Sequence, residues 1–438
     1  MYGFSMIQFV RRNGKQLDKQ LREQMLELYR PFRWIPCFLH SSLEKILKTT
    51  KTYSVIIEFE DCDEPYCDLV NLVHQTAKQN MRCRVKHEFP AISCCSAELT
   101  PLGIERLLKN CRRIKKVHYD RKVKALLNVA TPSIHADLVH QSGLTGKGVT
   151  IAVVDTGIYQ HEDLMNPTKR IVAFKDFVNN RPTAYDDNGH GTHCAGDAAG
   201  NGYASGGQYQ GPAPSANLIG VKVLDRMGSG SLSTVIAGVQ WCIDNKKTYS
   251  IDIISMSLGS TATVSAAEDP VVKIVEKAWA SGIVVCVAAG NEGPDEGTIA
   301  SPGISPIIIT VGAMDDQNTP DRNDDRVADF SSRGPTIDGV MKPDLLTPGD
   351  DIVSLRSPNS HLDKLSKSSR VGSRYFSLSG TSMATPICAG VAALILEKHK
   401  DFTPDQVKQM LLNGCENRGL PEVVQGHGYL DAEKALES

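Results

Sequence analysis

The sequence has no apolar run long enough to cross a bilayer, which takes about 18 consecutive apolar residues. Its first twenty residues also lack the apolar centre and the small-residue cleavage site of a secretory signal. We therefore expect a cytoplasmic protein with no membrane contact. Hydrophobic residues make up 41% and charged residues 22% of the 438 residues, which is typical of a globular protein with one large and one smaller domain.

Zinc-binding patterns are also missing, although the chain contains 12 cysteines. Without an export signal, we expect free thiols rather than a disulfide framework. Cys194 is of special interest because it closes a histidine-rich stretch, His190 to Cys194. We expect it to be a small buried residue, and the alternative is a thiol that makes the protein sensitive to thiol reagents.

The chain has almost no net charge (−2), but its two parts differ in sign. Residues 1–127 carry 23 Lys and Arg against 14 Asp and Glu, and the remaining residues carry 25 against 36. Opposite charges should make the two parts attract each other. A basic segment can also bind nucleic acid, but these charges are scattered and no nucleic-acid-binding motif accompanies them. We therefore expect no nucleic-acid partner.

The stretch from Gly380 to Pro386 (GTSMATP) predicts a sharp turn into an apolar helix over Ile387–Leu396. A serine here lies beside the free N–H groups of a helix N-terminus, which favour a developing negative charge. The simpler interpretation is that Thr381 or Ser382 only caps the helix.

A nucleophilic serine needs a base, and the base needs an orienting carboxylate. Asp155 ends an apolar strand over 150–155, where open α/β sheets place their chemistry. His190 lies in a glycine-rich loop. The alternatives are a turn-capping aspartate and a zinc pair of His190 with His193, but no HExxH motif or nearby Cys-x-x-Cys supports zinc.

Three motifs in this order, D-T-G at 155–157, H-G-T-H at 190–193 and G-T-S-M-A-x-P at 380–386, resemble the subtilisin-like serine proteases, or subtilases. The resemblance covers about Ala130 to Leu436 and is nearest to the signal-less intracellular alkaline proteases of bacteria. It implies a serine endopeptidase that acts on proteins or peptides with Asp155, His190 and Ser382 as its triad. It also implies a monomer and no cofactor for the chemistry.

The resemblance further assigns a substrate cleft. Asn291 is the expected oxyanion donor, with an Asn that shapes a left-handed turn as the alternative. Small residues in the expected P1 pocket leave room for an apolar side chain and favour broad specificity. The expected substrate-binding residues are Gly228, Ser229, Gly230, Ser257, Leu258, Gly259, Ala288, Ala289 and Gly290.

Short, β-branched, nearly continuous apolar runs alternate with helical stretches from residue 150 onward, which predicts buried parallel strands. The expected fold is α/β, with a doubly wound, mostly parallel sheet covered by helices on both faces. Residues 128–438 would form this catalytic domain.

Residues 1–50 predict a helical extension, and residues 51–127 predict a small α+β domain of β-α-β-β-α-β order. By resemblance, the small domain is a pro-domain that acts as folding template and intramolecular inhibitor. Its tail would be 122–127, with self-cleavage near Leu127-Asn128. An unrelated binding module is the alternative.

An acidic loop over 314–325 carries alternating oxygen ligands at Asp321, Asn323 and Asp325, which we take as candidate calcium ligands. Arg326 stands where an EF-hand needs glycine, so the alternative is a solvated acidic turn. The loop over 201–211, where the family's strong calcium site is expected, has no carboxylate.

Two other classes of function compete with a protease. One is a non-catalytic protein that holds peptides in the cleft, and the other is an esterase or acyl transferase with the same triad. The complete triad argues against the first, and a cleft long enough for peptides argues against the second.

Overall fold

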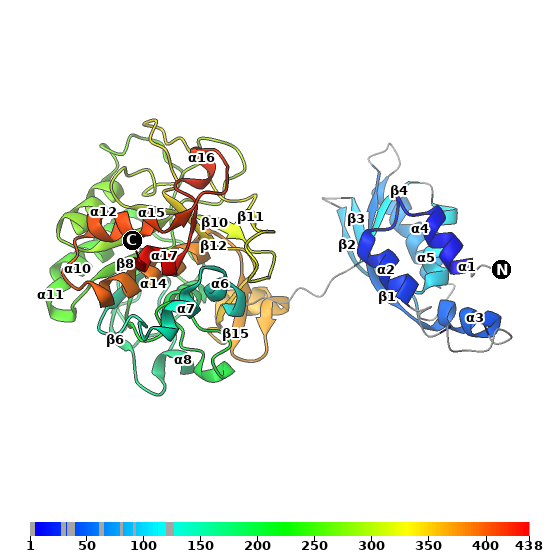
Figure 1. The fold of residues 1–438 in the computed structure, drawn as a ribbon, viewed down its shortest axis with the longest axis horizontal. Coiled ribbons are helices and arrows are strands. Elements are labelled where there is room, and N and C mark those ends of the chain that lie inside the picture. The colour runs from blue at the N-terminus through cyan, green and yellow to red at the C-terminus, as the bar shows by residue number, and fades with distance from the viewer. Residues whose placement is uncertain are drawn as a thin grey trace. The chain divides into compact units, whose positions relative to one another are not determined.

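The computed structural model describes residues 5–27, 32, 40–60, 65–78, 82–90, 93–111, 113–119 and 127–437. The chain forms two compact units, residues 1–123 and 124–438, each with its own hydrophobic core (Figure 1). The predicted inhibitory tail over 122–127 lies outside the described residues apart from its last position, which begins helix α6. No helix of the described residues is long and apolar enough to cross a membrane.

The large unit is built on a sheet in the order β16-β17-β12-β10-β9-β8-β5-β7-β6, with β11 paired to β10. Neighbours from β6 to β17 are parallel, while β11 and β16 are antiparallel. The strands are β5 (Thr150–Asp155), β6 (Ile171–Asp176), β7 (Asn217–Lys222), β8 (Ile253–Met256), β9 (Val284–Ala288), β10 (Ile309–Asp315), β11 (Arg326–Val327), β12 (Leu345–Pro348), β16 (Cys415–Glu416) and β17 (Tyr429–Leu430).

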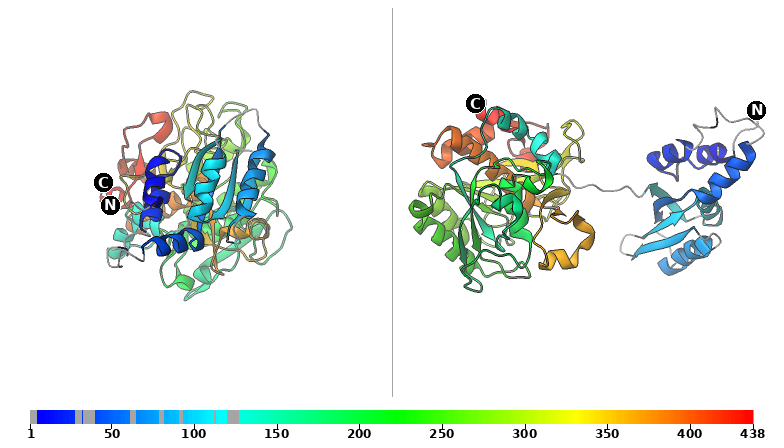
Figure 2. Two further views of the ribbon diagram at one scale, coloured as in Figure 1. Left: turned by 90° about the vertical axis from the view of Figure 1, so that its right-hand side faces the viewer. Right: turned by 90° about the horizontal axis from the view of Figure 1, so that it is seen from below.

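Two pairs of helices pack on this sheet. Helices α9 (His190–Ala199) and α14 (Thr381–Lys398) contact each other, and α14 also contacts β8, β9, β10 and β12. Helices α10 (Leu232–Asp244) and α12 (Pro270–Ala280) pack together as a second pair. Every residue of β5, β8 and β9 is buried, which means that both faces of the sheet are covered there. The predicted doubly wound α/β fold is therefore confirmed (Figures 1 and 2).

The strand order places the functional residues. The chain adds β7 and β6 on one side of β5, then returns to add β8 and β9 on the other side. In such sheets the crevice lies at the carboxyl ends of the strands where the order reverses. Asp155 is the last residue of β5, and Ser257 directly follows β8.

A second, three-stranded sheet in the order β13-β15-β14 was not predicted. Its strands are β13 (Ile352–Leu355), β15 (Tyr375–Leu378) and β14 (Arg370–Val371). The buried His193 ties this sheet to α9, since its Nε2 lies 3.1 Å from the Ile352 carbonyl and 3.0 Å from that of Phe376. These strands are two to four residues long, which is too short for a clear periodicity.

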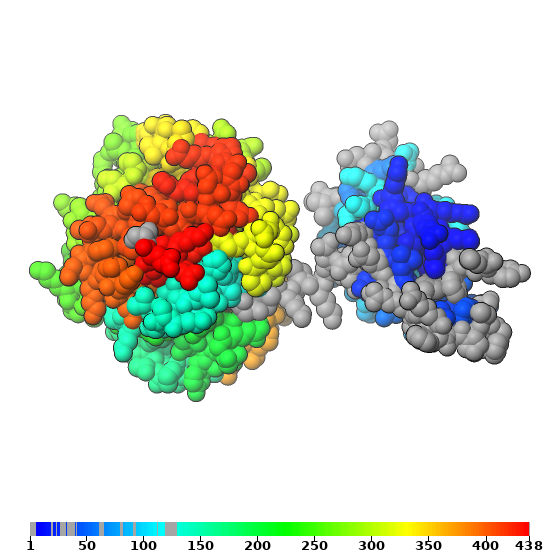
Figure 3. Space-filling view, viewed as in Figure 1, coloured from blue at the N-terminus to red at the C-terminus, as the bar shows by residue number. Residues whose placement is uncertain are grey.

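The remaining helices of the large unit are short, except for α15, which begins with a capping box between Thr403 and Gln406. Helix α17 lies beside α7 at the surface (Figure 3). These helices are α6 (Leu127–Ser133), α7 (Ala136–Gln141), α8 (Glu162–Met165), α11 (Lys246–Tyr249), α13 (His361–Leu365), α15 (Pro404–Asn413), α16 (Glu422–Gln425) and α17 (Ala432–Glu437), with 3-10 turns η4 (Tyr203–Ser205) and η5 (Lys367–Ser369).

The small unit contains an antiparallel sheet in the order β2-β3-β1-β4, which is the predicted split βαβ arrangement. Helices α4 and α5 pack on each other and on the sheet. Leu17, Leu21 and Met25 of the N-terminal segment share one core with the strands, so the described part of residues 1–50 packs with this unit. Its elements are α1 (Ser5–Arg12), α2 (Lys19–Glu27), α3 (His40–Thr50), β1 (Tyr53–Phe59), α4 (Tyr66–Lys78), β2 (Arg84–Phe89), β3 (Cys94–Leu99), α5 (Pro101–Asn110) and β4 (Ile114–Tyr119).

Candidate active site

Asp155 and His190 meet at the carboxyl end of β5. His190 Nδ1 lies 2.8 Å from Asp155 Oδ1, and the same oxygen accepts the Thr156 N–H at 2.7 Å. Asp155 is fully buried, while the His190 side chain keeps 21% of its surface exposed. This geometry fixes the imidazole ring and leaves its Nε2 edge for the groove.

The charge of Asp155 controls the protonation of His190. Burial alone would lower the pKa of the imidazole, but the adjacent carboxylate outweighs burial and raises the pKa well above its usual value. The neutral imidazole, which a general base requires, therefore becomes more abundant as the pH rises.

A buried carboxylate that the sequence analysis missed holds the histidine loop. Asp186 accepts hydrogen bonds from the Gly189 N–H (2.8 Å), the Thr192 N–H (2.9 Å) and the hydroxyls of Thr156 and Thr192. It therefore connects the turn after Asp155 to the start of α9. Two aspartates, Asp186 and Asp187, precede the Asn188-Gly189 turn, and an acidic residue shortly before such a turn is a local signal that could have pointed to Asp186.

A buried lysine, also missed, supports the same loops. Lys222 Nζ donates to the Thr156 carbonyl at 2.6 Å, to the Leu224 carbonyl at 2.8 Å and to Asp187 Oδ1 at 2.8 Å. Its side chain is fully buried at the end of β7. A lysine inside an apolar strand gives no sequence signal for this role.

Ser382 lies in the first turn of α14, which begins at Thr381 instead of the predicted Ile387. Pro386 has no N–H, so the Ser382 carbonyl four residues earlier lacks its helical donor. The hydroxyl of Ser257 (2.7 Å) and the thiol of Cys194 (3.4 Å) donate to that carbonyl instead. These two side chains fix the backbone that carries the predicted nucleophile.

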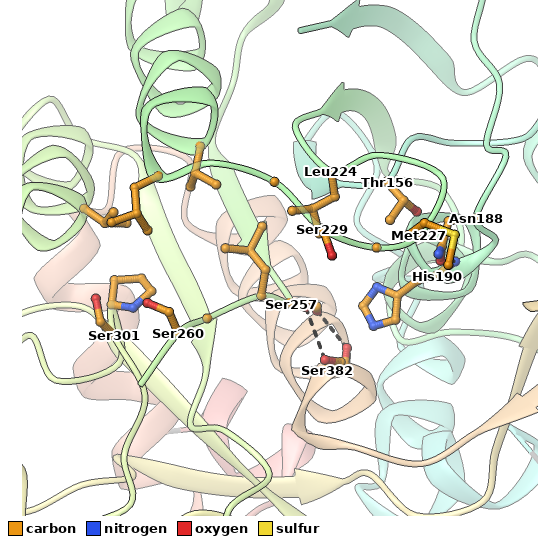
Figure 4. Close-up of a pocket in the computed structure, with 18 of the residues that line it drawn as sticks. Thr156, Asn188, His190, Leu224, Met227, Ser229, Ser257, Ser260, Ser301 and Ser382 are labelled. Atoms are coloured by element: carbon orange, nitrogen blue, oxygen red, sulfur yellow. Dashed lines mark hydrogen bonds between the residues drawn. The ribbon is translucent and has the colours of Figure 1, made fainter. Parts of the chain in front are cut away.

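The Ser382 hydroxyl itself donates to the Ser257 carbonyl at 3.2 Å. Within the described residues it makes no hydrogen bond to His190, although both side chains line one groove and lie side by side in Figure 4. Catalytic hydrogen bonds are often long before substrate binds, and rotation about χ1 of a serine is fast. The structure thus brings the three predicted triad residues together, with the serine hydroxyl turned toward Ser257.

Asn291 follows β9 and faces the start of α14. Its Oδ1 accepts the Thr381 N–H at 2.9 Å and the Thr381 hydroxyl at 3.0 Å. With the oxygen occupied in this way, the amide nitrogen is the atom left to donate into the cleft. Asn291 and Ser382 line the same hollow.

Two hollows meet at Ser382, a groove of about 560 Å³ and a second hollow of about 520 Å³, with Leu258 to Ser260 on the wall between them. Ala288 and Gly290 line the second hollow, whereas the fully buried Ala289 lines neither. The other six predicted substrate-binding residues line the groove, and they are Gly228, Ser229, Gly230, Ser257, Leu258 and Gly259.

Cys194 lies under the imidazole and is fully buried, with its Sγ 3.7 Å from His190 Nδ1. Burial raises the pKa of the thiol to about 11, so it stays protonated. Asp155, His190 and Cys194 offer ligand atoms within 4.8 Å of one another, but a metal there would break the Asp155–His190 hydrogen bond. His193 Nδ1 contacts Asp197 at 2.9 Å, which removes it from any zinc pair with His190.

All ten described cysteines are free thiols, as predicted.

The predicted calcium ligands Asp321, Asn323 and Asp325 differ in their exposure to solvent. Asp321 and Asn323 are exposed, and the Asn323 amide donates to Asp321 Oδ1 at 2.7 Å. Asp325 is instead buried. An amide that turns its nitrogen toward the carboxylate cannot offer its oxygen to the same ion.

Comparisons with known proteins agree with this geometry. The model of the subtilase family matches residues 146–429. The chain is 56% identical to serine protease AprX of Bacillus subtilis (strain 168), with 100% of this chain and 99% of that protein covered. It is 34% identical to a thermostable alkaline protease of Halalkalibacterium halodurans, with 88% and 92% covered.

Among solved structures, a cold-adapted subtilisin-like serine proteinase is 33% identical, with a TM-score of 0.50 over 66% of this chain and 88% of that one. A family match of this extent and a full-length relative, on a fold with this strand order, identify the class of enzyme. The chain belongs to the subtilase family and is a subtilisin-like serine endopeptidase.

Proposed function

We propose that Ser382, His190 and Asp155 cleave peptide bonds as nucleophile, general base and orienting carboxylate. The observation that carries the proposal is the 2.8 Å contact between His190 Nδ1 and Asp155 Oδ1 in the groove that also contains Ser382. Protein substrates follow from the family, and no organic cofactor takes part because subtilases need none. Calcium enters this proposal only as a structural ion, since no step of the reaction uses one.

The reaction begins when the Ser382 hydroxyl leaves the Ser257 carbonyl and turns to His190 Nε2. His190 takes the hydroxyl proton as Oγ attacks the substrate carbonyl, and Asp155 stabilises the imidazolium that forms. The proton then passes to the leaving amine. Water, activated by the neutral His190, hydrolyses the acyl-enzyme and restores the serine.

The oxyanion of the tetrahedral intermediate would accept hydrogen bonds from Asn291 Nδ2 and from the Ser382 N–H at the start of α14. Thr381 supports this role because it holds Asn291 Oδ1 in place. Such preorganised donors stabilise the transition state more than the ground state.

The substrate would lie as an extended strand along Gly228 to Gly230 and Ser257 to Gly259, which is a form of β-augmentation. The P1 side chain would enter the second hollow, where Ala288, Gly290 and Ala300 leave space for an apolar group. Backbone pairing recognises any sequence, so we propose broad specificity with a preference for apolar P1 residues.

The enzyme would be made as a zymogen. We propose that residues 51–127, preceded by the helical segment 1–50, are a pro-domain that inhibits residues 128–438 until self-cleavage near residue 127. The support is the separate core and the split βαβ sheet of the small unit. We place the working enzyme in the cytoplasm as a monomer, in line with the sequence analysis.

Intact-mass spectrometry of the purified chain over time tests this proposal, together with casein hydrolysis and a serine-directed fluorophosphonate label. We expect loss of about the first 127 residues, label on Ser382 and casein cleavage. The Ser382→Ala chain should stay intact and unlabelled, while the matched control Ser368→Ala, at an exposed serine, should behave like the parent. Self-processing of Ser382→Ala would refute the assigned nucleophile.

A further inference from the structure

Two buried aspartates face each other at the end of β10, far along the sequence from the triad. The antiparallel ladder of β10 and β11 pairs Met314 with Val327 and Asp315 with Arg326. The next facing positions in this register are Asp316 and Asp325. Only 2% of Asp316 and 9% of Asp325 are exposed. Like charges directly opposite each other in a ladder destabilise it.

These carboxylates lack the partners that buried charges require. Asp316 Oδ1 accepts the Asn318 N–H at 3.0 Å, but Oδ2 is buried without a hydrogen bond. Both oxygens of Asp325 are also buried, and the Tyr429 hydroxyl is the donor that faces them; this hydroxyl lies 3.1 Å from Ser133 Oγ, so it can serve only one of the two acceptors at a time. No ion pair of the described residues includes either aspartate.

The cations nearest to Asp325 are engaged elsewhere. The Nη groups of Arg322 donate to the carbonyls of residues 133, 429 and 430, and its Nε lies 3.3 Å from Glu416. Arg418 also contacts Glu416, at 3.2 Å. Arg322 therefore holds backbone carbonyls. Arg322 and Arg418 offset the charge of Asp325 only in part, and neither forms an ion pair with Asp325 among the described residues.

Other acidic residues make the electrostatic potential around Asp316 and Asp325 more negative. Burial raises the pKa of Asp316 to about 7 against the opposing hydrogen bond from the Asn318 N–H, and the charges of Asp325, Asp315 and Asp350 act in the same direction as burial. Burial likewise raises the pKa of Asp325 to about 6. Several carboxylates in one buried region favour a cation with more than one positive charge.

We propose that Asp316 and Asp325 bind a calcium ion. Buried carboxylate oxygens are hard ligands, and calcium accepts an irregular set of them completed by backbone carbonyls and water. The site lies in the acidic loop that the sequence analysis singled out, but it uses the buried Asp316 and Asp325 in place of the exposed Asp321 and Asn323. This proposal does not depend on the catalytic roles assigned to Asp155, His190 and Ser382.

The ion would stabilise the approach to the nucleophile. The Gly349 N–H donates to the Met314 carbonyl at the end of β10, and the Gly380 N–H donates to the Gly349 carbonyl, both at 2.8 Å. The Asp351 N–H donates to Ser379 Oγ at 2.9 Å. These hydrogen bonds connect the residues just before Ser382 to the end of β10, which the ion would stabilise.

Thermal unfolding after chelation, with and without calcium, tests the site in a full-length Ser382→Ala background that cannot digest itself. Calcium should raise the midpoint of this parent by about 5 °C. The rise should disappear in Asp316→Asn and in Asp325→Asn but persist in the matched control Asp321→Asn, an exposed acid of the same loop. Without calcium, Asp316→Asn should melt no lower than the parent, because it removes a like-charge pair.

Terbium gives a second, direct readout, since Tyr429 faces Asp325 and can sensitise its emission. The parent and Asp321→Asn should show terbium emission that falls when calcium displaces the terbium. Asp325→Asn should show no such emission, so the test remains valid even if Asp316→Asn fails to fold. Equal calcium shifts in all variants would place the ion elsewhere and overturn the proposal. If the parent shows neither a calcium-induced rise in its unfolding midpoint nor terbium emission, the two aspartates share a proton and bind no calcium. That result would also overturn the proposal.

Discussion

At the scale of single residues, each group around Ser382 has a partner that determines its chemical state. Asp155 sets the charge of His190, Thr381 sets the orientation of the Asn291 amide, and Ser257 accepts the resting Ser382 hydroxyl. These roles are therefore best tested by substitutions that remove a charge or a hydrogen-bond donor but keep the shape of the side chain.

Asp155→Asn keeps the shape of the carboxylate and removes its charge. Because the carboxylate raises the pKa of His190, the parent should lose activity as the pH falls through a value above the usual 6.5. In the variant this acid limb should move to lower pH, and kcat should fall by about 10⁴ because the imidazole tautomer is no longer fixed. Peptide hydrolysis against pH measures both effects.

Asp401→Asn, which removes an exposed charge at another place, is the control for this series. An acid limb that does not move in Asp155→Asn would contradict the assigned origin of the His190 pKa shift.

Asn291→Asp separates two roles of Asn291. An aspartate still accepts from Thr381 but has no Nδ2 donor, so kcat should fall by about 10²–10³ with little change in KM. Asn291→Ala should lose at least as much. Near-parental turnover of Asn291→Asp would show that the residue only holds the turn at Thr381.

The sequence alone predicts the triad residues because each motif keeps a reactive side chain at a turn beside a strand or helix end. It does not predict Asp186 or Lys222, whose roles depend on loops that meet only in the folded chain. The role of Thr347 is likewise visible only in the structure, where its hydroxyl donates to the Ala384 carbonyl at 2.7 Å. Ala289 has the small size expected of a pocket residue but points into the core.

At the scale of elements, helix α13 lines the groove that contains His190 and Ser382. The N–H groups of His361 and Leu362 donate to the carbonyls of Asp187 and Asn188 at 2.8 and 2.9 Å, and Leu362 lines the groove. Asp363 holds α13 in place, with Arg356 at 2.6 Å and Arg370 at 2.7 Å. Burial opposes ionisation of Asp363, but the two arginines outweigh it and lower its pKa to about 2.

Asp363→Asn should therefore destabilise the enzyme near neutral pH and reduce kcat/KM for peptides that contact Leu362. A lowered folded-state pKa contributes stability above the unfolded value of about 4, and this contribution is lost as the pH falls from about 4 to about 2. Thermal unfolding of parent and variant should thus differ at pH 7 and converge in that acid window. A difference that persists unchanged at the lowest pH would contradict the clamp, and Asp401→Asn again serves as control.

Long apolar strands such as β5, β7 and β9 are predictable because burial on both faces leaves a continuous hydrophobic run. Strands β6, β13, β14 and β15 are not. Strand β6 mixes exposed and buried positions, and the other three are only two to four residues long, which is too short for a clear periodicity. Helix α14 begins at Thr381, six residues before the predicted apolar run at Ile387, because the small and polar residues ahead of that run have no apolar periodicity that would show them to be helical.

At the scale of the whole molecule, two cores and two opposite net charges are present in one chain. The predicted domain boundary at 127/128 lies close to the division at 123/124, because a sheet pattern ends and a new one begins there. Whether the small unit inhibits the large one depends on the fit of two surfaces, which single-chain patterns do not encode. That role therefore rests on the family resemblance.

Inhibition of the processed enzyme by its own N-terminal fragment should weaken as salt is raised. The charges of opposite sign attract over a Debye length of about 10 Å at 0.1 M salt and only about 3 Å at 1 M. Residual casein hydrolysis measured after processing, at a series of salt concentrations and before the fragment is degraded, should rise with salt. Salt-independent inhibition would mean that apolar contacts hold the fragment.

The proline at position 386 has a consequence for the history of the sequence. Because it leaves the Ser382 carbonyl without a helical donor, the hydroxyl of Ser257 and the thiol of Cys194 are the groups that satisfy that oxygen. A lineage that exchanged the proline for a residue with an N–H would remove the selection for both donors at once. Positions 194, 257 and 386 should therefore change together across relatives, although 129 residues separate Ser257 from Pro386 along the chain.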